Sequence, residues 1–245
     1  MRVSASIVIY NEDEATLSKA INSFLTLDID KELIIVDNSP STLLKEFCEN
    51  FDNVEYIYSN VNIGFGAGHN LAFQNMKKAS DIHIIINPDV YFDNEIKDYF
   101  IWMSKVDNIS ISVPRVYFPN NVYQHTIRKL PTLLTLIKRK LNIKSDEFDE
   151  NDFKDISEIP FAHGCFLVFK TDIFNKLSGF DENFFMYMED VDIFIRAKKL
   201  GKTVLNPDYK IYHEFRKGSS VNKKLLLFHI KSALRFFFKY PKLIF

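Results

Sequence analysis

Short, nearly continuous apolar runs in the first half of the chain constrain its fold most strongly. They occupy residues 4–10, 32–37 and 81–87, and each ends in polar side chains. Such runs are typical of parallel strands that helices cover on both faces, because neither face of the strand then meets water. The stretches between them carry apolar residues at helical spacing. The sequence therefore predicts a β-α-β series and an α/β fold.

The remaining helices and strands are expected along the whole chain, and in its second half their pattern is more mixed. An acidic helix is expected from Asp190 to a stop at Gly201. The basic, apolar residues 127–144 favour a helix, whereas the acid-rich residues 146–155 are expected to form a solvated loop. Further helices are expected at residues 15–24, 42–50 and 64–78, and strands at residues 54–59, 109–116, 164–170 and 202–212.

Composition limits what the chain binds. With 245 residues, 47% of them hydrophobic, and a formal net charge of -1, it fits one domain and carries no overall signal for nucleic-acid binding. Cys48 and Cys165 match no disulfide or zinc spacing, which favours a reducing compartment. The N-terminus lacks the apolar segment of a signal peptide, and no apolar run is long enough to span a bilayer. These features predict a cytoplasmic location.

Polar residues follow the expected strands, at the edge where sheets of this kind bind ligands. Asp37 could accept the N–H of a pyrimidine base, although on its own it is more typical of a turn. Asp89 could hold a hard divalent cation with His213 as a second ligand, or His213 could be structural. The strand-end residues are Tyr10, Asn11, Glu12, Asp13, Asp37, Asn38, Ser39, Asn87, Pro88 and Asp89.

A glycine-rich segment opens one of the expected helices. Residues 60–70 are NVNIGFGAGHN, in which His69 stands in place of the last glycine of a GxGxxG pattern. The segment also follows the third expected strand along the chain, whereas the dinucleotide pattern follows the first. A Rossmann dinucleotide site is therefore not indicated. The glycines could allow a ligand to approach the backbone closely.

An acidic pair lies at a loop-to-helix junction in the second half of the chain. Glu189 and Asp190 follow the aromatic and methionine residues 184–188, which would wall off a carboxylate and make it a credible general base. The simpler alternative is that the acids complement the helix dipole. Asp192 lies four residues before Arg196, the spacing of a salt bridge along a helix.

The end of the chain is basic and amphipathic. No acidic residue follows Glu214, and Lys224, Lys231 and Arg235 can share one helical face. This pattern predicts an interfacial helix, and the alternative is a core-packing helix with a solvated face. The apolar face would comprise Leu226, Ile230, Ala233, Leu234 and Phe237.

Taken in order, these motifs resemble a known family. IVIYNED, LIIVDNSP, NVNIGFGAGHN, INPDV, GFDENFFMYMEDVDIFIRAKKLG and YHEFRKGSS look like those of a family 2 glycosyltransferase with a GT-A fold, a Rossmann-like mixed sheet flanked by helices. Within it, the chain is most similar to bacterial rhamnosyltransferases that use dTDP-L-rhamnose. The resemblance implies a catalytic domain at residues 1–215, with a nucleotide-sugar half (1–110) and an acceptor half (111–215), and a basic membrane-contact segment (216–245).

The resemblance also implies roles for individual residues. Asp190 would deprotonate the acceptor hydroxyl, with Glu189 as second choice, and Asp89 and His213 would hold Mg²⁺ or Mn²⁺. The wider family often has two aspartates at the metal site, whereas this chain has one, in the sequence NPD. The donor side would include Tyr10, Asn11, Glu12, Asp37, Asn62, Gly64, Gly66, Asn70, Asn87 and Arg216, and the acceptor side His163, Gly164, Cys165, Phe185 and Tyr187.

The implied reaction is an inverting transfer of L-rhamnose from dTDP-L-rhamnose to a polyprenyl-diphosphate-linked saccharide, in the assembly of O-antigen-type polysaccharide. The enzyme would be peripheral at the inner face of the cell membrane. A transferase that uses a UDP-hexose, carrying galactose or glucose, is the alternative among enzymes. A noncatalytic subunit that binds nucleotide sugar or membrane is the alternative of another class.

Overall fold

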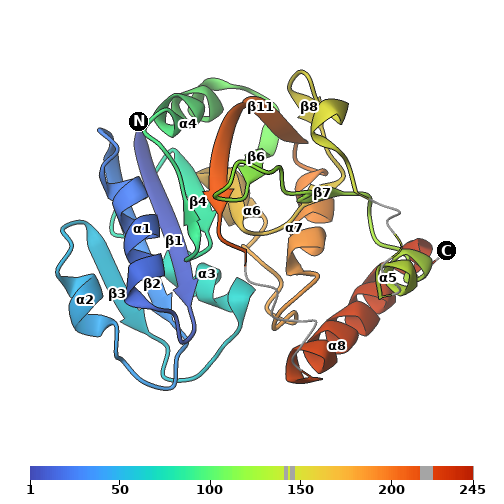
Figure 1. Ribbon diagram of the computed structural model, residues 1–245, viewed down its shortest axis with the longest axis horizontal. Helices are drawn as coiled ribbons and strands as arrows, with labels where there is room; N and C mark the ends of the chain where they lie inside the picture. The colour runs from blue at the N-terminus through green and yellow to red at the C-terminus, as the bar shows by residue number, and fades with distance from the viewer. Residues whose placement is uncertain (141–142, 144–146, 216–222, 245) are drawn as a thin grey trace.

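A mixed sheet forms the centre of the computed structural model, which describes residues 1–140, 143, 147–215 and 223–244 (Figure 1). Within these residues the sheet is nine-stranded, with the order β3-β2-β1-β4-β10-β6-β11-β5 and with β8 paired to β11. The strands are β1 (Arg2–Ile9), β2 (Asp30–Asp37), β3 (Val54–Tyr58), β4 (Ile82–Ile86), β5 (Val90–Tyr91), β6 (Ile109–Tyr117), β8 (Ser157–Glu158), β10 (Phe166–Lys170) and β11 (Lys202–His213).

The parallel half of the sheet agrees with the apolar runs. Strands β3, β2, β1 and β4 are parallel neighbours, and Ile9 of β1 lies opposite Asp37 of β2. Ile7 lies opposite Ile86 of β4. This register brings the carboxyl ends of β1, β2 and β4 to one edge of the sheet. Strand β10 runs antiparallel to β4, so Phe166, its first residue, meets the end of β4 at the same edge.

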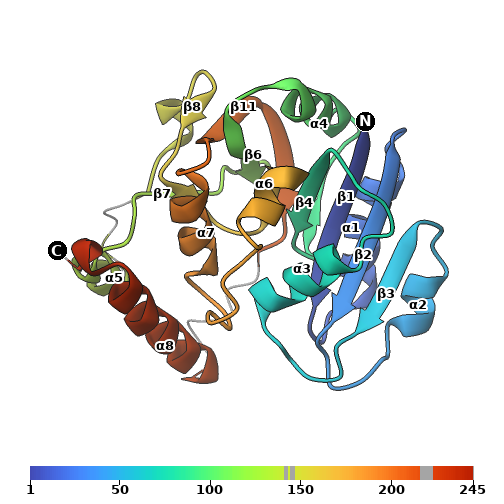
Figure 2. The same cartoon turned by 180° about the vertical axis from the view of Figure 1, so that it is seen from behind.

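Helices cover both faces of the sheet, which gives the molecule three layers (Figures 1 and 2). On one face, Leu17 and Phe100 pack in one apolar cluster. On the other face, Phe174, Phe194 and Phe236 pack in a second cluster. The helices are α1 (Glu14–Leu25), α2 (Lys45–Glu49), α3 (Phe65–Gln74), α4 (Ile96–Lys105), α5 (Leu133–Lys140), α6 (Thr171–Lys176), α7 (Glu189–Ala197) and α8 (Lys223–Lys239), with 3-10 turns at Glu150–Asp152 and Pro241–Leu243.

Residues 127–144 do not form the single helix that their composition predicts. They begin with the short strand β7 (Ile127–Arg128), which pairs with β9 (Phe161–Ala162). Helix α5 starts only after Pro131, because the residue before a proline is biased away from helical backbone. Thr132 then caps α5, since its hydroxyl accepts a hydrogen bond from the Thr135 N–H (3.2 Å).

The acid-rich segment, where the structure describes it, is largely exposed as its charge predicts, but it is anchored at specific points. Glu147 forms an ion pair with Arg128, with 2.8 Å between Oε1 and Nη2. Phe153 is buried, and its ring lies 5.4 Å from that of Phe148. The apolar residues of this segment therefore anchor it to the body of the protein.

Helix α8 packs along the edge of the molecule beside α7, with α5 near its C-terminal end (Figures 1 and 2). Phe236 and Phe237 face inward and are buried, whereas Leu234 and Phe238 are exposed. Phe237 therefore does not belong to an outer apolar face as predicted. In the described part of the chain no helix has the length and hydropathy to cross a bilayer.

Candidate active site

Hydrogen bonds join the carboxyl ends of β1 and β2. The Asn11 N–H donates to the Ser39 hydroxyl (2.8 Å), and the Tyr10 side chain beside it is exposed. The buried Asp37 carboxylate accepts from the Ser39 N–H (2.8 Å) and from the Tyr56 hydroxyl (2.7 Å). The turn that the sequence offers as the alternative at Asp37 is thus present. Each carboxylate oxygen keeps a second lone pair that can accept an N–H from a base.

The turn before α3 contacts both this edge and the loop before α7. Asn38 Nδ2 donates to the Gly64 carbonyl (3.0 Å), and the Phe65 N–H donates to the Phe185 carbonyl (3.0 Å). Gly64 has a φ of 94°, and a Cβ there would lie 2.3 Å from the Phe185 carbonyl oxygen. Asn62 Oδ1 accepts the Gly64 N–H (3.0 Å). Glycine is therefore required at this turn by backbone conformation and by internal packing.

Two other residues predicted for the donor side face the protein interior. A Cβ at Gly66 would lie 2.7 Å from Phe180. The Asn70 amide donates to the Phe180 carbonyl (2.9 Å) and accepts from the Phe180 N–H (2.8 Å). These contacts hold the segment that leads toward α7. Arg216, also predicted for the donor side, lies outside the described residues.

Strand β5 and the end of β11 bring Asp89 and His213 together. His213 Nε2 lies 3.2 Å from Asp89 Oδ1, because His213 pairs with Val90 across the two strands. Gln124 fixes the other side of the ring: its Oε1 lies 3.0 Å from His213 Nδ1, and its Nε2 donates to the His213 carbonyl (2.6 Å). Burial lowers the pKa of His213, whereas Cys165 and Asp89 raise it, and the result is a pKa of about 10.

The Asp89–His213 pair fits part of a divalent-cation site. A carboxylate oxygen suits Mg²⁺ or Mn²⁺, and an imidazole nitrogen is a transition-metal ligand. Two protein ligands would leave the other coordination positions to substrate phosphates. Across the residues that the structure describes, no group of three or more His, Cys, Asp or Glu is placed to hold a metal. Because a histidine ligates only in its neutral form, a metal and a proton compete for the His213 nitrogen.

The turn before β10 connects this pair to the acidic helix. The Cys165 carbonyl accepts the Asn87 N–H (2.9 Å), and Cys165 lies close enough to His213 to raise the pKa of its imidazole. On the other side of the turn, a Cβ at Gly164 would lie 3.5 Å from the Asp190 Cβ. The Gly164–Cys165 turn therefore lies between the predicted metal ligands and the predicted base. His163, the residue before it, is tied by its N–H to the Thr126 carbonyl (3.0 Å).

Glu189 and Asp190 begin α7 in different environments. Glu189 is buried, and its Oε2 has no hydrogen-bond partner among the described residues. Burial, together with the negative charge of Asp190, raises the pKa of Glu189 well above its ordinary value. Asp190 is half-buried at the Gly164 turn. A protonated carboxyl group is not a base, so this arrangement favours Asp190 over Glu189.

The aromatic run before these acids does not form one continuous wall, contrary to the sequence prediction. Phe184 and Met188 are buried in the core. Successive side chains of the loop point in different directions, so some of them enter the core and others face away from it. The rings of Phe185 and Tyr187 face α8, at centroid distances of 4.7 Å from Phe228 and 4.9 Å from His229.

The predicted salt bridge along α7 is confirmed. Arg196 Nε donates to Asp192 Oδ2 at 2.7 Å. Asp192 is fully buried and also binds two groups from the end of α8, Lys239 Nζ (2.6 Å) and the Tyr240 hydroxyl (2.7 Å). Asp192 therefore holds α7 to the C-terminal segment.

Sequence reasoning did not indicate several side chains that shape the site. Gln124 lies in a loop with no motif, and its contact with His213 depends on long-range folding. Asn38 was one of several polar strand-end residues without an assigned role. Ser232, Lys239 and Tyr240 of the C-terminal segment bind the α7 region, whereas the sequence pattern favoured an interfacial helix over one that packs on the core.

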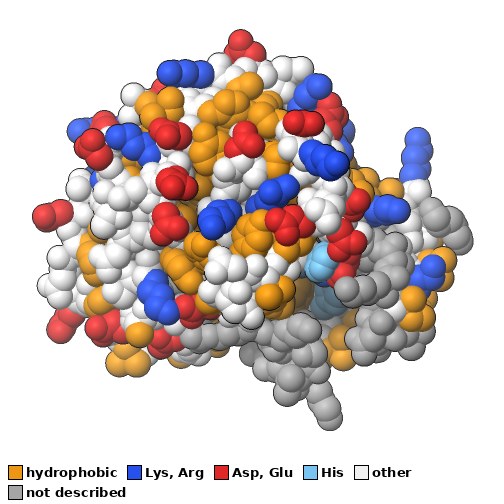
Figure 3. Space-filling view, turned by 45° about the horizontal axis from the view of Figure 1, so that its top comes forward, with side chains coloured by type: hydrophobic (Ala, Val, Ile, Leu, Met, Phe, Trp, Pro, Cys, Tyr) orange, Lys and Arg blue, Asp and Glu red, His pale blue; other side chains and the backbone are white. Residues whose placement is uncertain are grey.

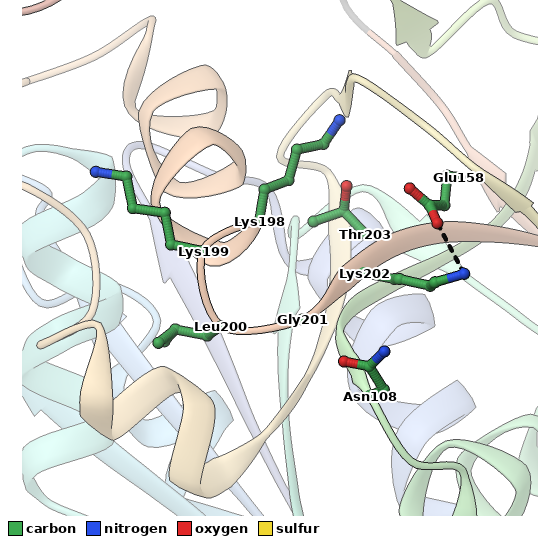
Figure 4. A pocket seen from close by; sticks show the side chains of 8 residues that line it. All are labelled: Asn108, Glu158, Lys198, Lys199, Leu200, Gly201, Lys202 and Thr203. Carbon is green, nitrogen blue, oxygen red and sulfur yellow. Dashed lines mark ion pairs between the residues drawn. The ribbon is translucent and has the colours of Figure 1, made fainter.

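The hollow in Figure 4 is separate from this site. It has a volume of about 410 Å³ and includes Lys198, Lys199 and Lys202 in its lining. Lys202 begins β11, whereas His213 ends it, so the hollow lies toward the opposite end of that strand. Figure 3 shows basic and acidic side chains interspersed over the described part of the face that it draws, with histidine side chains recessed between neighbouring groups.

Comparison with solved structures defines the class of protein. The fold is that of GT-A glycosyltransferases: GalNAc-T7 in complex with UDP, GalNAc and Mn²⁺ superposes with a TM-score of 0.70 at 17% identity, over 87% of this chain and 43% of that one. TarS 1-349 of S. aureus with UDP-GlcNAc gives a TM-score of 0.62 at 17% identity, over 94% of this chain and 66% of that one. The predicted GT-A fold is therefore confirmed.

The family model described as glycosyl transferase family 2 matches residues 4–178, and the chain belongs to this family. Rhamnosyltransferase WbbL of Escherichia coli K12 is 23% identical over 94% of this chain and 90% of its own length. The low-salt glycan biosynthesis hexosyltransferase Agl10 of Haloferax volcanii is 23% identical over 76% of this chain and 65% of its own length. The resemblance seen in the sequence motifs is thus confirmed at the level of the family.

Proposed function

We propose that the protein is an inverting rhamnosyltransferase that moves L-rhamnose from dTDP-L-rhamnose to a hydroxyl of a polyprenyl-diphosphate-linked saccharide. The observation that carries the proposal is the Gly164–Cys165 turn, which has Asp190 on one side and the Asp89–His213 pair on the other. A base for the acceptor and a site for the departing diphosphate thereby lie next to each other. Similarity to a rhamnosyltransferase over 94% of the chain supports the choice of sugar.

Asp190 would accept the proton of the acceptor hydroxyl as its oxygen attacks the anomeric carbon. The new bond joins the acceptor oxygen to that carbon, and the bond from carbon to the diphosphate oxygen breaks with its electron pair on the diphosphate. Asp89 and His213 would hold Mg²⁺ or Mn²⁺, which when bound supplies charge neutralisation for the diphosphate. The Asp37 edge would bind the base of the donor, and the face of Phe185 and Tyr187 would border the acceptor.

Membrane contact is part of the same proposal. Helices α5 and α8 both expose large apolar side chains, and Lys231 is exposed among those of α8. Such a surface suits reversible attachment to anionic lipid, where a lipid-linked acceptor resides. The protein would then act at the inner face of the cell membrane. The exposed apolar residues are Leu133, Leu134 and Ile137 of α5, and Leu226, Leu227, Ile230, Leu234 and Phe238 of α8.

A panel of nucleotide sugars tests the proposal. The purified protein is incubated with dTDP-L-rhamnose, UDP-galactose or UDP-glucose and a lipid-linked N-acetylglucosamine acceptor, with Mg²⁺, Mn²⁺ or a chelator. The expected result is transfer from dTDP-L-rhamnose that the chelator abolishes and either cation restores. Preferred transfer from a UDP-hexose would show that the donor is that nucleotide sugar and not dTDP-L-rhamnose. The absence of both sugar transfer and donor hydrolysis under all of these conditions would favour a noncatalytic subunit.

A further inference from the structure

The loop that leads into α7 has an unusual backbone. Tyr187 and Met188 both lie in the left-handed region, with φ values of 70° and 69°. A non-glycine residue in this region adds strain of roughly 1–3 kcal/mol, so the surrounding structure must hold the two residues there. Because Glu189 and Asp190 follow directly, this backbone determines where the two acids lie.

The inner face of α8 contacts the loop beside the strained residues. The buried Ser232 hydroxyl donates to the Met186 carbonyl at 2.8 Å, one residue before Tyr187. Phe228 and His229, one turn earlier in α8, pack on the rings of Phe185 and Tyr187. Every residue from Phe185 to Tyr187 therefore contacts α8.

The Ser232 hydroxyl is used differently from those of serines in other helices. Ser23 in α1 donates to the Ala20 carbonyl and Ser104 in α4 to the Ile101 carbonyl, both at 2.9 Å. Serine commonly bonds to its own helix in this way. Ser232 instead donates to the loop before α7, directly beside its two left-handed residues.

The opposite side of the loop rests on α3. The Phe65 N–H donates to the Phe185 carbonyl at 3.0 Å, and the absence of a side chain at Gly64 permits this approach. The loop is thus held between α3 and α8. The α3 hydrogen bond is made by backbone atoms, whereas the α8 hydrogen bond to the Met186 carbonyl comes from one side-chain hydroxyl that a substitution can remove.

We infer that Ser232 is a positioning residue for Asp190. Its hydrogen bond to the Met186 carbonyl holds Tyr187 and Met188 in the left-handed conformation and thereby places Asp190 beside the Gly164 turn. The inference rests on the proposed role of Asp190 as the base. It gives the inner face of α8 a part in catalysis that is distinct from the membrane contact proposed for its outer face.

The test compares Ser232→Ala, which removes the hydroxyl, with Ser232→Thr, which keeps it. Ser104→Ala is the matched control, because it removes a helix serine whose bond stays within α4. With dTDP-L-rhamnose and lipid-linked N-acetylglucosamine, Ser232→Ala should lower kcat about tenfold, the factor that corresponds to one hydrogen bond, and leave the donor KM unchanged. Ser232→Thr should restore most of kcat, and Ser104→Ala should match the wild type. Thermal unfolding confirms that each variant is folded at the assay temperature.

A double-mutant cycle with Asp190→Asn separates positioning from a general structural effect. If Ser232 acts through Asp190, Ser232→Ala lowers kcat in the wild type but has no further effect in the Asp190→Asn background. Equal losses in both backgrounds, or a wild-type kcat in Ser232→Ala, would overturn the positioning role and leave the proposed base in place. A wild-type kcat in Asp190→Asn alone would overturn the base, and with it this inference.

Discussion

Two adjacent carboxyl groups at the start of α7 differ in burial, and this difference determines the chemistry open to each. Glu189 is enclosed, and burial together with the charge of Asp190 raises the pKa of its carboxyl group, which favours the neutral form. Asp190 lies half-buried at the turn that leads to the predicted metal ligands. Two neighbouring acids can therefore serve as one base and one neutral partner.

Replacement of Asp190 tests the assignment of the base. Asp190→Asn keeps the size of the side chain but cannot accept the acceptor proton, so kcat should fall by about 10²–10⁴-fold. Nucleotide affinity, measured by calorimetry, should stay at the wild-type value because the Asp37 edge is untouched. Asp107→Asn, at a fully exposed aspartate, is the control and should keep full activity. A variant that loses nucleotide binding together with kcat would contradict a role confined to the acceptor.

The pKa of Glu189 predicts a dependence of stability on pH. Its folded-state pKa is raised above the ordinary value of 4.5. Above that value the folded chain holds a proton that the unfolded chain has released, so the free energy of unfolding falls as the pH rises toward the folded-state pKa. Glu189→Gln removes this titration. Between about pH 5 and about pH 8, the free energy of unfolding of the variant, measured in urea, should rise relative to that of the wild type as the pH increases. A constant difference across this range would contradict the prediction.

At the scale of elements, α6 and α7 contain two ion pairs with the same spacing and different burial. Lys176 and Asp172 of α6 are mostly exposed, whereas Asp192 of α7 is fully buried and Arg196 is 20% exposed. Arg196 also donates to the carbonyls of Leu177 and Gly179 (2.8 Å and 2.9 Å). The α7 pair therefore ties its helix to the loop that precedes the acids, whereas the α6 pair, among the described residues, joins two side chains of its own helix.

Removal of the cation from each pair should give unequal results. Arg196→Met leaves the buried Asp192 with fewer partners and should lower the free energy of unfolding by about 3 kcal/mol. Lys176→Met, the matched control, should lower it by about 0.5 kcal/mol or less. Arg196→Lys should recover only part of the loss, because a single ammonium group cannot reproduce the three directions of the guanidinium bonds. Similar losses for both methionine variants in urea titrations would contradict the role of burial.

Local pattern predicts the elements well where it is strong. The apolar runs of β1, β2 and β4 and the helical spacing of α1 agree with the structure, because each pattern reflects burial of that element alone. Residues 127–144 were mispredicted because Pro131 and the pairing of β7 with β9 outweigh composition. The two-residue strand β5 is too short to leave a pattern, yet it places Asp89 beside His213.

The site as a whole was predictable only in part. Asp89, His213 and Asp190 were indicated by their places in motifs, but the turn at Gly164 that brings them together depends on how β10 enters the sheet. Gln124 and Ser232 carry no local signal, since each acts through long-range hydrogen bonds. His69 shows the reverse case: it stands out in the glycine-rich motif but lies buried in the core, where burial lowers its pKa and it bonds to the Ser6 hydroxyl (2.8 Å).

At the scale of the whole molecule, the contacts of α8 change the expected dependence of membrane binding on salt. Arg235, which the sequence pattern placed on the basic face, binds the Asn183 carbonyl, and Lys239 binds the Asp181 carboxylate, both in the loop before α7. Among the described residues of α8, fewer basic side chains are therefore available to contact lipid than the sequence pattern predicts. The outward stripe is mainly apolar and includes Leu234 (69% exposed) and Phe238 (91% exposed).

We therefore expect binding to anionic vesicles that salt weakens but does not abolish. Each apolar side chain that enters the lipid interface contributes roughly 1.5–3 kcal/mol when fully buried, so the Leu234→Ser, Phe238→Ser double variant should bind at least about tenfold more weakly. Leu43→Ser is the matched control, because Leu43 is 87% exposed just before α2, far from α8 (Figure 1). Vesicle sedimentation at low and high salt measures all three proteins. Wild-type binding by the double variant, or no binding by the wild type at low salt, would show that the outward face of α8 does not contact lipid.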